Sequence, residues 1–79
     1  MEKSVLLTKH AAERALKYNL TKEAIIEIIR RGRRLREGKT KVRFTLKTKR
    51  GLLVAICEEY TNQIIVLTIT KGKKLGVEK

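Results

Sequence analysis

The sequence predicts an α+β fold in which two N-terminal helices pack on a three- or four-stranded antiparallel sheet. Two observations support this prediction. Apolar residues follow the spacing of a helix up to about residue 31, and after residue 40 they alternate or run together as they do in strands. The length of 79 residues argues for a single basic domain spanning residues 1–79. An apolar share of 42% suffices for a small core and is too high for a disordered chain.

Residues 8–18 and 21–31 are the two expected helices, separated by a short break at Asn19-Leu20. The first follows Thr8 and the second follows Thr21, and threonine is a good residue for capping a helix N-terminus. Glu23 stands in the first turn of the second helix, where the helix dipole favours negative charge. Ala24, Ile25, Ile28 and Ile29 give this helix one apolar face, and Gly32 marks its expected end.

Three strands are expected after the helices. In KVRFTLKT (41–48) apolar and polar residues alternate, which predicts a half-buried strand with one basic face. LLVAIC (52–57) predicts a central strand, and IIVLTIT (64–70) a further strand. The segment 33–37 fits either an edge strand or an extension of the second helix. The residues expected in the core are Ile25, Ile28, Ile29, Phe44, Val54, Ile56, Val66 and Leu67.

The charge of the chain points to a polyanionic partner. Twenty Lys and Arg residues stand against eight Glu, which gives a net charge of +12. Such a field attracts nucleic acid first, an acidic protein second and an anionic membrane surface third. The alternative is a surface adapted for solubility or for a thermophilic source, which the scarcity of Pro, Asn and Gln also suggests. Thermophile surfaces pair opposite charges, however, and this excess is unpaired.

The run RRGRRLREGKTKVR, residues 30–43, concentrates that charge, with eight cations against Glu37. Arginine suits phosphate because its planar fork makes two parallel hydrogen bonds. Cations at a helix end would explain only two or three of the eight. The residues expected to bind nucleic acid are Arg30, Arg31, Arg33, Arg34, Arg36, Lys39, Lys41, Arg43 and Lys47. A second basic group comprises Lys47, Lys49, Arg50, Lys71, Lys73 and Lys74. These residues could equally be further binding residues or lysines that protect a sheet edge from aggregation.

His10, Arg14 and Tyr18 share one helical face at spacings of four residues. As a site, the stripe would suit metal-independent RNA cleavage, with His10 as acid or base and Arg14 beside the phosphate. As scaffold, His10 and Arg14 would instead hydrogen-bond the backbone between helix and sheet. Spacing alone leaves both readings open.

The remaining features predict a cytoplasmic protein without metal or cofactor. Cys57 lies in an apolar run and is expected to be a buried small side chain, and a lone cysteine permits no intrachain disulfide. No His, Cys and carboxylate cluster has the spacing of a metal site. No apolar run approaches the roughly 20 residues that span a membrane, and the apolar core of MEKSVLLTKH is too short for a signal peptide.

The stretch LTKHAAERALKYNLTKEAIIEIIRRG resembles the start of a small family known as domain of unknown function 4258, through Thr8, His10, Ala11, Arg14 and Leu20. The resemblance covers residues 5–72. That family in turn resembles the RelE, ParE and BrnT toxins, several of which are metal-independent endoribonucleases neutralised by an antitoxin. Those toxins commonly act through Arg, Lys, Tyr or His on the sheet and near the C-terminus. Here Arg43, Lys47 and Tyr60 stand in that part of the chain, and no His does.

The resemblance therefore implies a basic, toxin-like domain that interacts with nucleic acid, RNA before DNA. In one reading it is an endoribonuclease in which His10 is the acid or base and Arg14, Arg43 and Lys47 hold the phosphate. In a second it is a non-catalytic nucleic-acid-binding module. In a third it is an interaction domain for an acidic, antitoxin-like protein.

Overall fold

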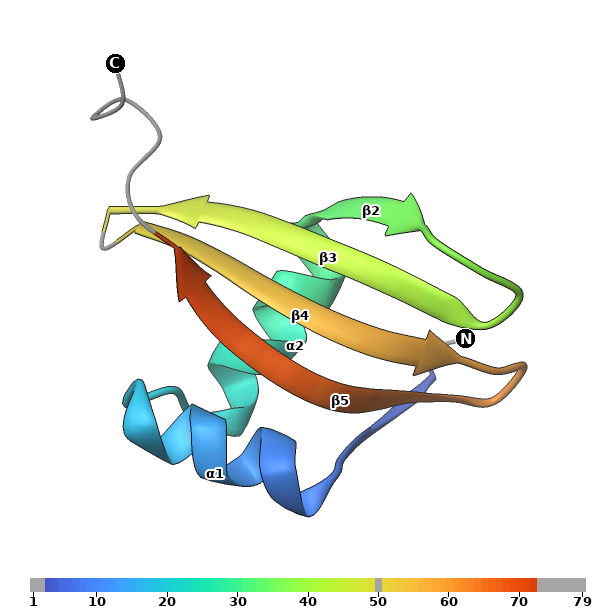
Figure 1. Ribbon diagram of the computed structural model, residues 1–79, viewed down its shortest axis with the longest axis horizontal. Coiled ribbons are helices and arrows are strands. Elements are labelled where there is room, and N and C mark those ends of the chain that lie inside the picture. The colour runs from blue at the N-terminus through green and yellow to red at the C-terminus, as the bar shows by residue number, and fades with distance from the viewer. Residues whose placement is uncertain (1–2, 50, 73–79) are drawn as a thin grey trace.

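The computed structural model describes residues 3–49 and 51–72, which form two helices and one five-stranded sheet (Figure 1). The elements in chain order are β1 (Ser4–Leu7), α1 (Lys9–Lys17), α2 (Lys22–Arg31), β2 (Arg33–Arg36), β3 (Lys41–Thr48), β4 (Gly51–Glu59) and β5 (Gln63–Gly72). The strands lie in the order β1-β5-β4-β3-β2. β1 runs parallel to β5, and the other neighbours are antiparallel.

The prediction of a three- or four-stranded antiparallel sheet was therefore wrong in size and in type. The sheet of the structure has five strands and is mixed. The missing strand is β1, which has only four residues and pairs with a partner almost 60 positions later in the chain. Four residues are too few to display a strand period, so no local pattern announced β1. The segment 33–37 contributes the edge strand β2. β5 continues through Lys71 and Gly72, beyond the end expected for that strand at residue 70.

The two helices form as expected and are capped by the two predicted threonines. The Oγ1 atoms of Thr8 and Thr21 accept hydrogen bonds from the N–H groups of Ala11 and Ala24, each at 3.1 Å. Asn19 takes a φ of 60° in the break between the helices, a left-handed conformation that asparagine tolerates. None of the helices in the part of the chain that the structure describes is long and apolar enough to cross a bilayer.

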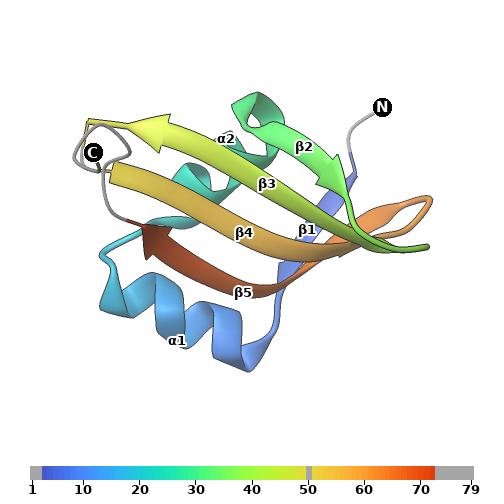
Figure 2. The same cartoon turned by 45° about the horizontal axis from the view of Figure 1, so that its top comes forward.

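As Figure 2 shows, α2 packs on one face of the sheet, against β3 and β4, and α1 runs along the outer edge of β5 and packs on the same core. The core lies between the two layers. Its buried residues are Ala11, Ala15, Ile25, Ile28, Val42, Phe44, Leu53, Ala55, Cys57, Ile64, Val66 and Ile69. The opposite side of the sheet carries neither helix, and we call it the open face.

The core prediction failed in part because it misassigned β4. Leu53, Ala55 and Cys57 face the helices, whereas Val54 and Ile56 alternate with them and are only half-buried on the open face. Every residue of LLVAIC is apolar, so the run carries no polar residue to mark which side faces water. Ile29 and Leu67 are likewise half-buried rather than buried.

Candidate nucleic-acid interface

The open face carries a row of cations along β3. Lys41, Arg43 and Lys47 are exposed, and they alternate with Val42 and Phe44, which are buried under the helices. Alternate residues of a strand lie about 6.6–6.8 Å apart on the same face. The row is therefore a straight line of positive charge rather than a single cluster.

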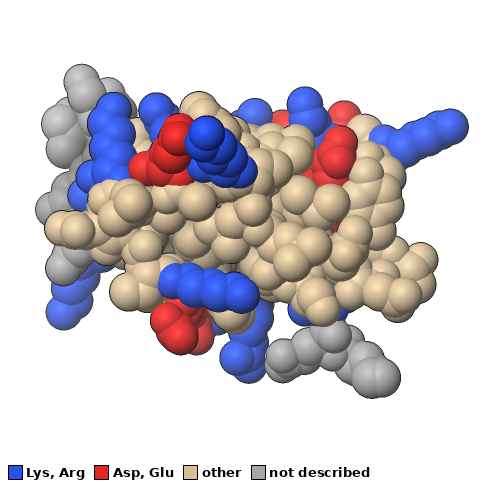
Figure 3. Space-filling view, turned by 90° about the horizontal axis from the view of Figure 1, so that it is seen from below, with Lys and Arg blue, Asp and Glu red and all other residues tan. Residues whose placement is uncertain are grey.

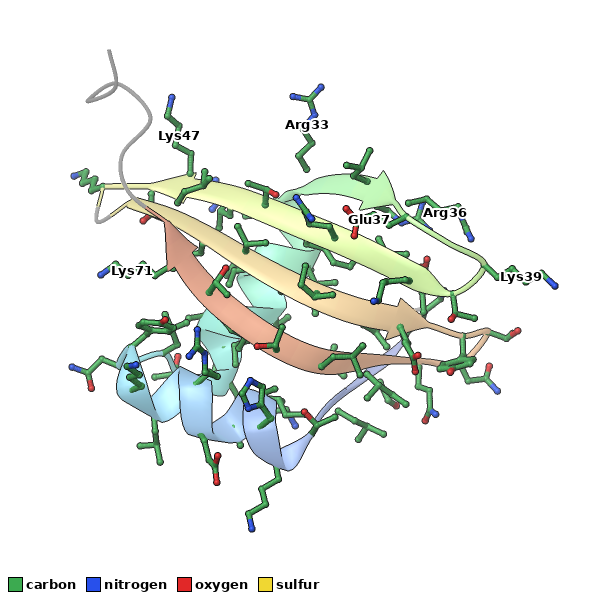
Figure 4. The ribbon with its side chains drawn as sticks, in the orientation of Figure 1. Arg33, Arg36, Glu37, Lys39, Lys47 and Lys71 are labelled. Atoms are coloured by element: carbon green, nitrogen blue, oxygen red, sulfur yellow. The ribbon has the colours of Figure 1, made fainter. Side chains whose placement is uncertain are left out.

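The edge strand β2 adds a fourth cation to this surface. Arg33 pairs with Thr45, which alternates with the buried residues of β3, so Arg33 also stands on the open face. Figure 4 shows Arg33 and Lys47 extending outward from β2 and β3. We call the four residues Arg33, Lys41, Arg43 and Lys47 the basic row.

Two carboxylates of the described residues lie close to the basic row, since Glu58 of β4 stands opposite Lys41 in the register and Glu37 lies beside Arg43. Glu37, in the loop between β2 and β3, places Oε2 3.0 Å from the Nη2 atom of Arg43. Among the described residues, Arg33, Lys41 and Lys47 make no ion pair. The loop carries Lys39, which is exposed. Arg36 donates to the carbonyl oxygens of Lys39 and Gly38, at 2.7 and 3.4 Å, and so holds the loop closed.

The other predicted binding residues face elsewhere. Arg34 pairs with Phe44 in register and so lies on the helix side of the sheet, where it forms an ion pair with Glu59. Arg31 in the last turn of α2 lies 3.6 Å from Glu27, and Arg30 lies in the same turn. The structure thus brings together the four cations of the basic row and separates Arg30, Arg31 and Arg34 from them. Of the second basic group, Arg50, Lys73 and Lys74 lie outside the described residues.

A strip of aliphatic side chains on β4 adjoins the basic row. The pairing places Leu52 beside Lys47, Val54 beside Thr45 and Ile56 beside Arg43. Threonines of β5 continue the face, with Thr68 beside Ile56 and Thr70 beside Val54. The strip was not predicted as part of a surface. The signal that could have revealed it is the alternation with Leu53, Ala55 and Cys57, once one face of β4 is known to be buried.

The stripe on α1 is divided between two roles. Arg14 donates through Nε to the carbonyl of Ile69 at 3.1 Å and through Nη2 to the Tyr18 hydroxyl at 3.0 Å. Its guanidinium also lies 5.3 Å from the centre of the Tyr18 ring, within cation–π range. Arg14 is thus bonded to the sheet backbone, as the scaffold reading expects. His10 is exposed and, among the described residues, has no hydrogen-bond partner, as the site reading requires.

The reason for these bonds is that β5 is longer than its partner. β1 pairs with Gln63–Val66 of β5 and then ends. From there on, side chains and the N–H of Thr8 bond the edge of β5. Thr8 donates through its N–H to the carbonyl of Val66 at 3.1 Å and through Oγ1 to the carbonyl of Leu67 at 3.0 Å. Arg14 donates to the carbonyl of Ile69. These donors replace the missing strand and satisfy polar groups that are costly to leave unpaired.

Arg14 and the basic row stand apart. Arg14 is held at the outer edge of β5, and β4 lies between β5 and β3. With strands about 4.8 Å apart, the backbones of β5 and β3 are separated by roughly 10 Å. The predicted set of His10, Arg14, Arg43 and Lys47 is therefore divided between α1 and β3, with β5 and β4 between them, and does not surround one phosphate.

Three titratable groups outside the basic row have shifted pKa values. Glu59 accepts hydrogen bonds from Lys3, at 2.8 Å, and from Arg34, and these bonds hold the pKa of Glu59 below its usual value. Cys57 is fully buried, and desolvation raises the pKa of its thiol to about 12. On the exposed turn after β4, the hydrogen bond to Glu58 raises the pKa of Tyr60.

Within residues 3–49 and 51–72, no three His, Cys or carboxylate side chains gather closely enough to hold a metal ion. Comparison of the chain with protein-family models, with curated proteins and with solved structures gave no match.

Proposed function

We propose that this chain binds the phosphate backbone of RNA through the basic row of the open face, without cleaving it. The observation that carries the proposal is the alignment of Arg33, Lys41, Arg43 and Lys47 on one exposed surface of a chain with a net charge of +12. The strands fix the backbone positions of these cations, and counterion release favours their binding to phosphates. The resemblance of residues 5–72 to the domain of unknown function 4258, and of that family to toxins that act on RNA, adds support for an RNA ligand.

The width of the open face favours RNA over duplex DNA. Five strands at a spacing of about 4.8 Å make a surface about 19 Å wide, whereas the major groove of DNA is about 12 Å wide. A broad sheet face instead suits single-stranded RNA or an RNA loop, whose backbone can lie along the strands. Phe44, the one aromatic residue of β3, is buried on the other side, so phosphate contacts rather than base stacking provide the affinity.

Cleavage of RNA is the second candidate function, and the exposed ring of His10 is the observation that favours it. Attack by the ribose 2′-hydroxyl needs a base, an acid and stabilisation of negative charge. The stripe on α1 offers one titratable group for this purpose, because the guanidinium of Arg14 is already bonded to Ile69 and Tyr18. Binding without catalysis therefore accounts for more of the geometry.

The test is the salt dependence of binding to a fluorescent single-stranded RNA. Each phosphate neutralised contributes about −0.7 to the slope of log affinity against log salt. The triple variant Arg33→Ala, Lys41→Ala, Lys47→Ala should therefore flatten the slope by about 2. A matched triple variant, Lys9→Ala, Lys17→Ala, Arg31→Ala, removes the same charge from the helices and should leave the slope close to that of the wild type. Equal flattening by the two triples would contradict binding at the basic row.

Incubation with RNA in the presence of a chelator separates the two candidate functions. We expect the RNA to be recovered intact from the wild type and from His10→Ala. Cleavage by the wild type that disappears in His10→Ala, with binding retained, would establish the second candidate instead.

A further inference from the structure

An apolar groove follows the free edge of β1, on the side of the molecule away from the open face. Two hollows of about 240 and 180 Å³ meet at Val5. The first is lined mainly by β1 and by Ala12, Leu16 and Leu20, and the second by Ile26 and Ile29 of α2. Figure 3 looks from below, the side on which α1 lies in Figure 1, and shows a broad central area without charged side chains.

The groove is lined partly by core residues, since Ala15 and Ile25 line the first hollow and Ile64 the second, and partly by apolar residues that the fold leaves half-buried or exposed. On α2, Ile25 and Ile28 are buried in the core, whereas Ile26 and Ile29 turn to the second hollow. On α1, Ala11 and Ala15 are buried, and Leu16 is 80% exposed at the first hollow. Both helices thus carry a second apolar stripe. A contiguous exposed apolar surface of this kind marks a site of protein interaction.

The backbone of β1 adds a second feature to the groove. Among the described strands, β1 is an edge strand, with a neighbour only on the β5 side. Ser4 and Thr8 donate their N–H groups toward β5, to the carbonyls of Asn62 and Val66, both at 3.1 Å. Backbone groups of successive residues alternate in direction, so those of Val5 and Leu7 point outward, where an added strand would pair.

Charge decides which occupant fits. Of the residues that the structure describes, those lining the two hollows include the cations Lys3, Lys22 and Arg30 and no carboxylate. Lys3 is paired with Glu59, whereas Lys22 and Arg30 make no ion pair among the described residues. A second copy of the chain, docked by the same surface, would set these cations against one another in a pair of molecules that each carry +12.

We propose that this groove binds an acidic, amphipathic segment of a partner protein as a strand added to β1. Its apolar side chains fill the two hollows, and its carboxylates meet Lys22 and Arg30. The inference is independent of RNA binding, because the basic row lies on the opposite side of the sheet.

The test selects binders from a displayed library of random dodecapeptides at physiological salt, and then measures the affinity of the enriched peptides. We expect acidic residues interspersed with apolar ones. Leu16→Gln should weaken these peptides at least tenfold, the loss expected for removing a central interface side chain. Leu35→Gln is the matched control, because Leu35 is 56% exposed on β2, and it should change the affinity less than about twofold.

A charge-reversal pair completes the design. Lys22→Glu, Arg30→Glu should weaken the same peptides, and Lys41→Glu, Lys47→Glu, with the same change in net charge on the open face, should weaken them much less. Enriched peptides without acidic residues, or peptides that bind Leu16→Gln as well as the wild type, would overturn the proposal. So would a dimer of the wild type in sedimentation that Leu16→Gln converts to monomer, because a second copy would then occupy the groove.

Discussion

Replacing Arg14 by Ala should lower the free energy of unfolding by about 2 kcal/mol. A hydrogen bond from a charged donor contributes about 1.5–3 kcal/mol, and Arg14 makes one to the Ile69 carbonyl at 3.1 Å. Its cation–π contact with Tyr18 adds about 0.5–1 kcal/mol at a partly exposed position. Water can reach part of the vacated edge of β5 and recovers some of this loss, so we expect a value near the lower end of the sum.

Thermal unfolding followed by circular dichroism measures the effect. One kcal/mol shifts the Tm of a domain of this size by about 4–8 °C, so Arg14→Ala should melt about 8–16 °C below the wild type. Two controls narrow the cause. Arg14→Lys keeps the charge without the fork and should recover part of the loss, and Lys17→Ala removes an exposed cation from the same helix, 6.0 Å from the Tyr18 ring, at little cost.

The outcome that would refute this reasoning is an Arg14→Ala protein that melts within about 3 °C of the wild type, well under 1 kcal/mol, yet has lost RNA binding or cleavage. Arg14 would then contact the ligand, and its bond to Ile69 would be dispensable. A protein that melts early and binds RNA normally per folded molecule would confirm that Arg14 is part of the scaffold.

Three further predictions concern stability and reactivity. Lys3 and Arg34 depress the pKa of Glu59 in the folded state. The ionised Glu59 should therefore stabilise the fold fully above its unfolded pKa of about 4.5, and this stabilisation should be lost as the pH falls through the folded pKa. Urea unfolding across this pH range should show that the stability of Glu59→Gln depends less on acid than that of the wild type. Gly32→Ala would place a Cβ atom 2.9 Å from the Thr45 carbonyl oxygen, so it should lower the free energy of unfolding by about 1–3 kcal/mol in the same assay. Gly38→Ala should lower it less, because its Cβ atom would meet nothing closer than 3.7 Å. The Cys57 thiol is buried and has its pKa raised to about 12. It should therefore react with a disulfide reagent only as fast as the protein unfolds in buffer, and immediately in urea. A fast reaction in buffer would show that the core opens locally.

The helices could be predicted from the sequence because their signals are local. Thr8 and Thr21 lie three residues before the N–H groups from which they accept hydrogen bonds, and the isoleucines of α2 repeat within two turns. β1 could not be predicted, because its pairing depends on residues 63–66, and four residues carry no period of their own. The same limit applies to β4, where a fully apolar run identifies a strand but not the side that faces the helices.

The sequence predicted the class of ligand for the candidate interface but not which residues form the interface. A sequence gives the number of cations in residues 30–43, and only the register of β2 on β3 shows which of them share a face. Arg33 and Arg34 are adjacent in the chain and point to opposite sides of the sheet, one to the open face and the other to Glu59. Charge density along the chain is thus good evidence for the class of ligand and poor evidence for the residues that contact it.

The spacing of Thr8 and Arg14 follows from matching a helix to a strand edge. Six residues of helix advance about 9 Å. Val66 and Ile69 pair with Cys57 and Ala55, which are two steps apart on β4, so they lie about 7 Å apart along the sheet. A helix that runs beside β5 therefore brings its N-cap threonine to Val66 and Leu67, and the long side chain of Arg14 covers the remaining difference to Ile69. His10 lies between these two anchors and is bound by neither. The architecture thus explains why Thr8 and Arg14 are present at that spacing but leaves His10 unexplained, so His10→Ala is the variant that tests whether the stripe does anything beyond holding α1 to the sheet.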